Sequence, residues 1–204
     1  AAENMELYDI ETNSEVYKLG IHLLDEAPSF DSPEKMFQYT HTRTKELLKR
    51  NQFLTFFGGE HSISIGIIKA FYEAYSNLTV LQIDAHADLR PFYDGTPYNH
   101  ACAVYDASQN CNLVQVGIRS MDISEKVNMN IEQTYFAHDI LHQSFDWMDG
   151  AINQMTDMVY VTVDLDAFDS SIMPATGTPE PGGLGWHTVT TLLKKTFKRK
   201  NVVG

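Results

Sequence analysis

The sequence predicts an α/β domain in which a parallel β-sheet is sandwiched between helices. Short β-rich runs alternate with longer stretches of helical periodicity along the 204 residues. The β-rich runs are almost continuously apolar, as in strands that are buried on both faces. A chain of this length can bury a sizeable core, so we expect a single domain over residues 1–204.

The expected elements follow in order along the chain. A helix should begin after Ser32, because Ser-Pro-Glu combines a capping hydroxyl, a first-turn proline and an acid near the positive end of the helix dipole. Its apolar residues recur at helical spacing as far as residue 50. We expect strands over 53–57, 78–83, 112–116, 134–137 and 158–163, and helices over 62–75 and 188–197.

Charge and composition narrow the range of partners and compartments. The chain has 27 acidic and 15 basic side chains, a formal net charge of −12, which argues against nucleic acid or an anionic membrane as a partner. No apolar run approaches the roughly 18 residues of a membrane-spanning helix, and the acidic start lacks a signal-peptide pattern. Only two cysteines occur, so a reducing, cytoplasmic location is expected.

Polar clusters follow three of the expected strands. Gly-Gly-Glu-His ends at His61, Asp-Ala-His-Ala-Asp spans residues 84–88, and Asp-Leu-Asp spans residues 164–166. The carboxyl ends of parallel strands meet at one edge of a sheet, where ligands bind in α/β folds. Positions i, i+2 and i+4 of an extended segment share a face, so each cluster should present its Asp and His side chains together.

The residue types in these clusters favour a metal site. Neighbouring carboxylates repel one another unless a cation neutralises them, and four Asp with two His exceed what one ion needs. Two ions sharing bridging carboxylates would use them all, and hard oxygens with imidazoles suit Mn²⁺ while tolerating Co²⁺, Fe²⁺ or Zn²⁺. Such a pair activates water for hydrolysis. The alternative is that Asp84 and Asp164 only cap helices or turn the chain. The candidate ligands are His61, Asp84, His86, Asp88, Asp164 and Asp166.

Five motifs together resemble the ureohydrolases, the family of arginase and agmatinase. They occur in collinear order between about residues 50 and 190: GGEHS (58–62), DAHADLR (84–90), NHACA (99–103), VDLDAFD (163–169) and TGTPEPGGL (176–184). The resemblance implies a three-layer α/β/α fold with a central, mostly parallel sheet. It also implies two Mn²⁺ per chain and the hydrolysis of a guanidinium group to urea and an amine.

The resemblance also assigns roles within the site. One ion would be held by His61, Asp84, Asp88 and Asp164, and the other by Asp84, His86, Asp164 and Asp166, so that Asp84 and Asp164 bridge. Asp88 would pass a proton from the attacking water to the leaving amine. His100 resembles the family's proton-shuttling histidine. No nucleotide or other organic cofactor is expected.

The same resemblance suggests a substrate. TGTPEPGGL, with Glu180, looks more like the agmatinase branch, and residues 90–99 lack the arginase pattern for holding an α-carboxylate. Asp94 in that loop would suit an amine tail. We therefore expect a small cationic guanidine, with agmatine cleaved to putrescine and urea in polyamine biosynthesis; arginine and guanidinobutyrate remain alternatives. A homo-oligomer, trimer or hexamer, is implied by the resemblance.

Alternatives from other classes remain open at this point. The family's opening strand and a later strand with a substrate-binding glutamate have no counterpart here, so the chain resembles a family domain truncated at both ends. It could then be a catalytically impaired fragment with a structural role. Zinc deacetylases share the fold, but their single-ion site lacks counterparts of Asp88 and Asp166. His138 and His142 are expected to be surface or packing residues, Cys102 a buried one, and Asp169 a turn residue.

Overall fold

The computed structural model describes residues 6–204, which separate into two compact units. Residues 6–30 belong to the first unit, which contains the short helix η2 (Val16–Leu19) and an antiparallel bridge between Asp9 and Ser14. Residues 31–204 form the second unit, which holds the sheet and all helices described below. One domain over residues 1–204 stays a prediction.

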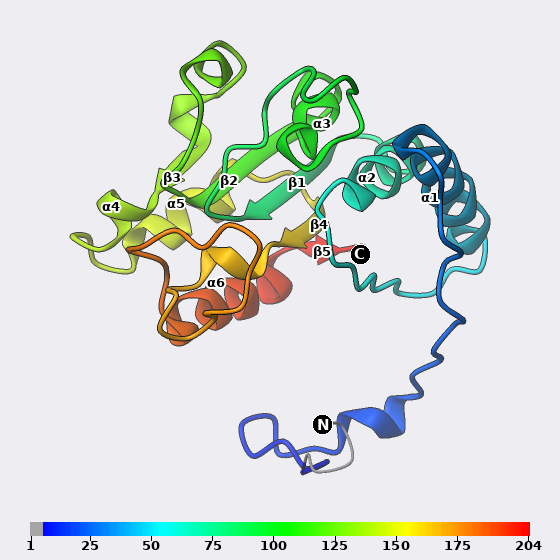
Figure 1. Ribbon diagram of the computed structural model, residues 1–204. Coiled ribbons are helices and arrows are strands. Elements are labelled where there is room, and N and C mark those ends of the chain that lie inside the picture. The colour runs from blue at the N-terminus through cyan, green and yellow to red at the C-terminus, as the bar shows by residue number, and fades with distance from the viewer. Residues whose placement is uncertain (1–5) are drawn as a thin grey trace. The chain divides into compact units, whose positions relative to one another are not determined.

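The second unit is built on a five-stranded parallel sheet with the order β3-β2-β1-β4-β5 (Figure 1). All residues of the central strand are buried, and β1 is hydrogen-bonded to β2 on one side and β4 on the other. The strands are β1 (Leu78–Ile83), β2 (Asn112–Ile118), β3 (Thr134–Phe136), β4 (Met158–Val163) and β5 (Asn201–Val202).

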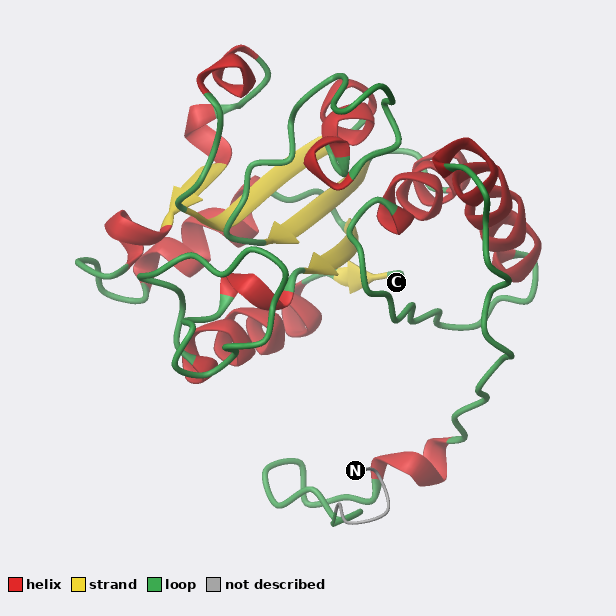
Figure 2. Cartoon of the chain, viewed as in Figure 1, coloured by secondary structure: helices red, strands yellow, loops and turns green. Residues whose placement is uncertain are grey.

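Helices cover both faces of this sheet (Figure 2). Leu81 and Ile83 of β1 point to the face packed by α5 and α6, whereas Leu78 and Val80 point to the face packed by α2 and α3. This alternation gives three layers, which confirms the expected α/β/α fold. The helices are α1 (Pro33–Leu48), α2 (Ile63–Ala74), α3 (Tyr105–Asn110), α4 (Ala137–Ile140), α5 (Asp146–Gln154) and α6 (Trp186–Arg199).

Short helices and caps complete the connections. The Oγ of Ser32 accepts a hydrogen bond from the N–H of Lys35 at 3.3 Å, so α1 begins as the sequence predicts. The remaining 3-10 turns are η3 (His100–Cys102), η4 (Ile123–Val127), η5 (Ile131–Gln133) and η6 (Leu165–Ala167). Within residues 6–204, no helix combines the length and apolar character that crossing a membrane requires.

The prediction of a strand over residues 53–57 is wrong. This segment has no regular secondary structure, and no ladder within residues 6–204 includes it. An apolar run becomes a strand only where a neighbouring strand takes its N–H and C=O groups, a condition that composition does not reveal. Its side chains pack on helices instead: the Phe56 ring meets Phe71 of α2 edge-on at 6.3 Å, and Phe53 lies 6.2 Å from Phe197 of α6.

Gly66 allows α1 and α2 to pack closely. A Cβ at this position would lie 2.3 Å from Thr40 Oγ1 and 2.7 Å from the carbonyl oxygen of Phe37, both on α1. We predict that Gly66→Ala destabilises the protein by about 1–3 kcal/mol, because this overpacking exceeds the gain of up to about 1 kcal/mol in helix propensity. Urea denaturation followed by circular dichroism measures the change.

Gly150→Ala is the matched control within another helix. The nearest atom to its added Cβ is the hydroxyl oxygen of Tyr135 at 3.2 Å, at the end of a side chain that can shift. We expect this variant to be as stable as the wild type or slightly more stable. Equal unfolding midpoints for the wild type and Gly66→Ala would contradict the close packing of the two helices.

Candidate metal centre

The candidate site lies at the carboxyl edge of the sheet, where β1 and β4 run side by side. Asp84 follows β1 directly, and its N–H donates to the carbonyl oxygen of Val116 at 3.0 Å. Asp164 follows β4 directly, and its N–H donates to the carbonyl oxygen of Ile83 at 2.9 Å. Backbone pairing therefore extends past both strands and holds the two aspartates next to each other.

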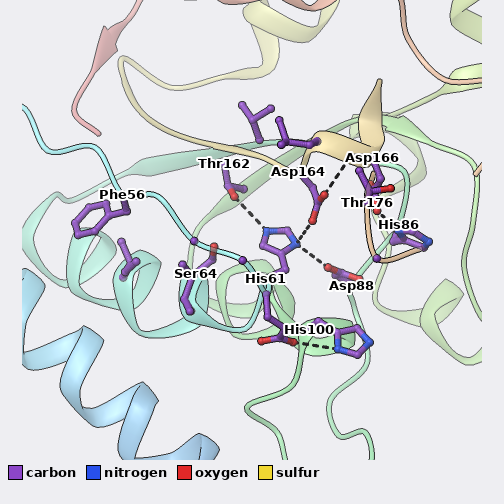
Figure 3. Close-up of a pocket in the computed structure, with 18 of the residues that line it drawn as sticks. Phe56, His61, Ser64, His86, Asp88, His100, Thr162, Asp164, Asp166 and Thr176 are labelled. Atoms are coloured by element: carbon purple, nitrogen blue, oxygen red, sulfur yellow. Dashed lines mark hydrogen bonds and ion pairs between the residues drawn. The ribbon is translucent and has the colours of Figure 1, made fainter. Parts of the chain in front are cut away.

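His61 is the meeting point of three carboxylates, two of which, those of Asp88 and Asp164, are seen in Figure 3. Its Nδ1 lies 2.9 Å from Asp88 Oδ2, 3.2 Å from Asp84 Oδ2 and 3.5 Å from Asp164 Oδ2. On its other side, Nε2 lies 3.2 Å from the hydroxyl of Thr162 in β4. The buried imidazole thus directs one nitrogen at a point where negative charge converges.

A second group of ligand atoms shares Asp84 with the first. His86 Nδ1 lies 3.1 Å from Asp166 Oδ2 and 3.7 Å from Asp84 Oδ1. The other carboxylate oxygen of Asp166 accepts a hydrogen bond from the N–H of Ala85 at 3.2 Å. Among residues 6–204, two sets offer three ligand atoms within 4.8 Å of one another: His61, Asp84 and Asp164, and Asp84, His86 and Asp166.

All six residues expected from the sequence are therefore gathered at one edge of the sheet. Asp84 belongs to both sets, as a bridging ligand would, whereas Asp164 belongs only to the first. Asp88 lies against His61 but outside both sets. The complete ligand assignments, with Asp164 as a second bridge, stay predictions.

The local backbone differs from the extended geometry expected for these motifs. After β1 the chain bends at Ala85, His86 forms an isolated bridge with Ser120, and Asp88 has a φ of 52° in the left-handed region. Asp164 caps η6, since its Oδ1 accepts the N–H of Asp166 at 3.1 Å. The side chains converge because the chain turns at each strand end, and Asp164 also fills the capping role considered as an alternative.

Two buried glutamines of the sheet hold the Asp84 carboxylate in place. Gln82 in β1 donates its side-chain amide to Asp84 Oδ2 at 2.9 Å, and Gln115 in β2 donates to Gln82 Oε1 at 2.7 Å. Gln115 also donates to the carbonyl oxygen of Ala87 at 2.9 Å. A polar pair in the middle of the sheet is costly unless fully hydrogen-bonded, so these contacts both satisfy it and fix the carboxylate.

The two histidines carry protons when no metal is bound. Burial alone lowers the pKa of His61, but hydrogen bonds to Asp84 and Asp88 outweigh it and raise that pKa well above the usual value. Hydrogen bonds to Asp166 and Asp84 raise the pKa of His86 to about 10. Each imidazolium therefore supplies positive charge that the cluster lacks.

The carboxylates show the opposing effects of burial and charge. Burial raises the pKa values of Asp88 and Asp164, and the negative charge of Asp84 raises both further. Burial also disfavours ionisation of Asp84, but hydrogen bonds with His61 and His86 hold its pKa below the usual value. This cluster is a set of hard oxygen and imidazole donors that needs cationic charge, so it fits divalent metal ions such as Mn²⁺.

His100 lines the same cavity, which has a volume of about 1180 Å³, but stands apart from the six clustered residues. Its Nδ1 lies 3.0 Å from Glu60 Oε1, and the Tyr93 ring meets it edge-on at 6.0 Å. Arg90 lines the cavity too and stacks on Tyr93 with its guanidinium carbon 4.5 Å from the ring centroid. Asp94, expected to face an amine tail, is exposed, and within the described chain it does not line this cavity.

The other residues named in the sequence analysis lie outside the two ligand groups. His138 is 72% exposed, and neither set of possible metal ligands within residues 6–204 includes it or His142. Asp169 is a turn residue, as expected, and accepts the N–H groups of Ser171 and Gly183 at 3.0 and 3.1 Å. Cys102 is buried, which raises its pKa.

Sequence reasoning missed the neighbours that complete the site. Thr162 lies two positions before Asp164 in β4, and this spacing could have placed it on the same side. Glu60 was visible within GGEHS but carried no signal of its contact with His100. Arg119 makes all its side-chain hydrogen bonds to backbone carbonyl oxygens.

Known proteins resemble this chain throughout its length. It is 32% identical to an N(1)-aminopropylagmatine ureohydrolase of Thermus thermophilus across 100% of this chain and 71% of that protein. It is 35% identical to the agmatinase of Pyrococcus horikoshii across 73% of this chain and 51% of that protein. The solved agmatine ureohydrolase of Thermoplasma volcanium superimposes with a TM-score of 0.87 at 25% identity, covering 98% of this chain and 69% of that one.

The family model for arginases matches residues 1–204. The match includes both groups of clustered Asp and His residues at the carboxyl edge of the sheet. This chain belongs to the arginase family.

Proposed function

We propose that this chain is a metal-dependent ureohydrolase, which cleaves a guanidinium group to urea and an amine. The observation that carries the proposal is the pair of ligand groups joined by the buried carboxylate of Asp84. Membership of the arginase family and relatives named as ureohydrolases support it.

Two Mn²⁺ ions are the proposed cofactors. His61, Asp84, Asp88 and Asp164 would hold one, and Asp84, His86, Asp164 and Asp166 would hold the other. The convergence of Asp84, Asp88 and Asp164 on His61 Nδ1 supports the first set, and the contacts of His86 with Asp84 and Asp166 support the second. When bound, such a pair polarises the substrate and makes a water nucleophilic near neutral pH.

The chain's own residues would move the protons. Water adds to the guanidinium carbon, and the bond from that carbon to the substituted nitrogen then breaks, so the leaving amine must gain a proton. Asp88, whose pKa is raised by burial, is the proposed carrier from the water to that nitrogen. His100, which lines the cavity, would exchange protons with solvent, and Glu60 at 3.0 Å holds its Nδ1.

The substrate we propose is a guanidine with a cationic amine tail. Agmatine, which yields putrescine, is the first candidate because of the agmatinase-like TGTPEPGGL segment. N(1)-aminopropylagmatine, which would yield a triamine, is the second, because relatives named for it match along 100% of this chain. Both substrates suit a cavity lined by acids, including Glu60 and Asp122, better than arginine with its carboxylate does.

The proposal extends to the cellular setting. A role in polyamine biosynthesis, a cytoplasmic location and a trimeric or hexameric assembly accompany the proposed activity. The negative net charge of −12 supports attraction of a cationic substrate, an effect that should weaken as ionic strength rises.

Removing both proposed bridging carboxylates should abolish metal binding and catalysis together. In Asp84→Ala/Asp164→Ala, each ion loses two of its four protein ligands, so we expect no bound Mn²⁺ after desalting and no urea release above background. Metal analysis and a urea assay on the same sample measure both. Asp139→Ala, which removes an exposed carboxylate outside the site, should leave both unchanged.

Metal analysis and the urea assay on the wild-type chain also distinguish the three functional alternatives. Two Mn²⁺ per chain with urea release supports the ureohydrolase proposal, whereas one Zn²⁺ with deacetylation indicates the zinc-dependent class. Bound metal without urea release from any guanidine indicates a fragment with a structural role. Urea release by a metal-free double variant would contradict the metal-based chemistry.

Substrate preference follows from the charge of the cavity. We predict that agmatine or N(1)-aminopropylagmatine has a kcat/KM at least about tenfold above that of arginine, because the arginine carboxylate meets the acidic lining. Initial rates of urea release from the three compounds at equal concentration give the ranking. A preference for arginine would contradict the proposed substrate class.

Metal binding should release protons near neutral pH. His86 with a pKa of about 10 and His61 with a pKa well above its usual value are protonated at pH 7, and a metal takes only the neutral imidazole. We expect roughly one to two protons released per chain, and weaker metal binding as the pH falls. Calorimetric Mn²⁺ titrations in PIPES and Tris at pH 7 count them from the dependence of enthalpy on the buffer.

A matched pair of variants shows which histidine releases protons when Mn²⁺ binds. His86→Ala should lower the number released, whereas His187→Ala, which changes an exposed histidine of α6, should not. Identical binding enthalpies in the two buffers would mean that neither imidazole loses a proton and would contradict the protonated state of these histidines in the metal-free chain.

A further inference from the structure

Arg119 stands at the carboxyl end of β2, directly after Ile118, and faces the segments that follow β4. Its own N–H donates to the carbonyl oxygen of Ala85 at 2.8 Å, so its backbone is paired with the turn that follows β1. The side chain is half-buried and makes six hydrogen-bond contacts, all to backbone carbonyl oxygens; Nη2 has two N–H groups and three acceptors, so at least one N–H is shared. This cation therefore acts as a connector of backbone segments.

The six acceptors belong to three segments of the chain. Gly117 lies in the same strand as Arg119, and its oxygen accepts at 3.2 Å. The shortest contact is from Nη2 to the oxygen of Asp166 at 2.6 Å, and the oxygens of Ala167 and Phe168 accept at 3.4 Å each. The third segment is the 176–184 loop, in which the oxygens of Glu180 and Pro181 accept at 2.9 and 3.1 Å.

Only arginine can make this set of contacts. A guanidinium presents five N–H donors in a rigid plane, whereas a lysine ammonium presents three donors at one point. The fork spans the gap between Asp166 and the 176–184 loop, so both are fixed relative to β2. The loop is also paired with η6, because the N–H of Leu184 donates to the oxygen of Ala167 at 2.9 Å. Losing Arg119 should therefore loosen the loop without releasing it.

The contacts of Arg119 concern only one of the two ligand groups. The carbonyl oxygen of Asp166 accepts a hydrogen bond from Arg119, and its carboxylate contacts the N–H of Ala85 and the imidazole of His86. Both the backbone and the side chain of Asp166 are therefore held in place. Glu180 places its Oε1 3.9 Å from His86 Nε2, beside the same group. Within the described chain, no side-chain hydrogen bond of Arg119 reaches the group around His61.

We propose that Arg119 is a positioning residue for the metal position formed by Asp84, His86 and Asp166. Its guanidinium holds the backbone of Asp166 and of Glu180, and through them it sets the geometry of this one position. The position around His61 is linked to Arg119 less directly, through the shared Asp84 and the hydrogen bond from the N–H of Asp166 to Asp164 Oδ1, so it depends on Arg119 less. The inference rests on the proposed function, since it assumes that the cluster binds two ions.

The test is a Mn²⁺ titration of Arg119→Met and Arg119→Lys. Removing a supporting contact of a metal ligand typically lowers metal affinity about tenfold to a hundredfold. We expect the wild-type chain to bind two ions, and Arg119→Met to bind one with little change in affinity and the second about tenfold to a hundredfold more weakly. Arg119→Lys keeps the charge but offers fewer N–H donors, so its affinity for the second ion should be intermediate. This variant also disturbs the fold least. Arg50→Met, an exposed arginine, is the control.

Electron paramagnetic resonance distinguishes a single bound Mn²⁺ from a coupled pair of ions without any activity measurement. At one Mn²⁺ per chain, Arg119→Met should show the hyperfine-split signal of an isolated ion, whereas coupled pairs should require a large excess of metal. Two ions bound as in the wild type would overturn the role of Arg119, and so would equal weakening of both positions, which a general loss of structure produces. A wild-type chain that binds no Mn²⁺ would overturn the proposed function and this inference with it.

Discussion

The structure depends on the burial of several carboxylates at one edge of a parallel sheet. Asp84 is completely buried and lies against His61 and His86, while Asp88, Asp164 and Asp166 crowd the same space. Negative charges in such a place are costly unless cations offset them. In the metal-free chain the two protonated imidazoles provide part of that compensation, and divalent ions would provide more. The same demand for positive charge underlies three proposals: the metal centre, its coupling to protons and a preference for cationic guanidines.

Much of the fold and the site could be predicted because both depend on local pattern. Strands β1 and β4 are largely apolar runs, and Asp84 and Asp164 come directly after them. The rule that ligands bind at the carboxyl edge of a parallel sheet brings these two together. The six candidate ligands could thus be named from strand ends and residue types alone. The structure places five of them in two ligand groups and Asp88 against His61, and their role as ligands stays a prediction.

What could not be predicted depends on contacts between distant segments. Residues 53–57 have the composition of a strand, but the segment pairs with no described neighbour and packs on helices instead. The bend at Ala85 and the positive φ of Asp88 replace the extended geometry that the spacing suggests. The bonds of Gln115 to Gln82 and of Arg119 to Glu180 join residues 33 and 61 positions apart. Nothing in the local sequence at either end of these bonds identifies the other.

The central claim is that two metal ions sit side by side on a shared Asp84 carboxylate. Anomalous diffraction at the manganese absorption edge, from crystals grown with Mn²⁺, tests it most directly. Two anomalous peaks about 3.5–4 Å apart are predicted, one beside His61 Nδ1 and the other between His86 and Asp166. A single peak, or peaks that do not touch Asp84, would contradict the account.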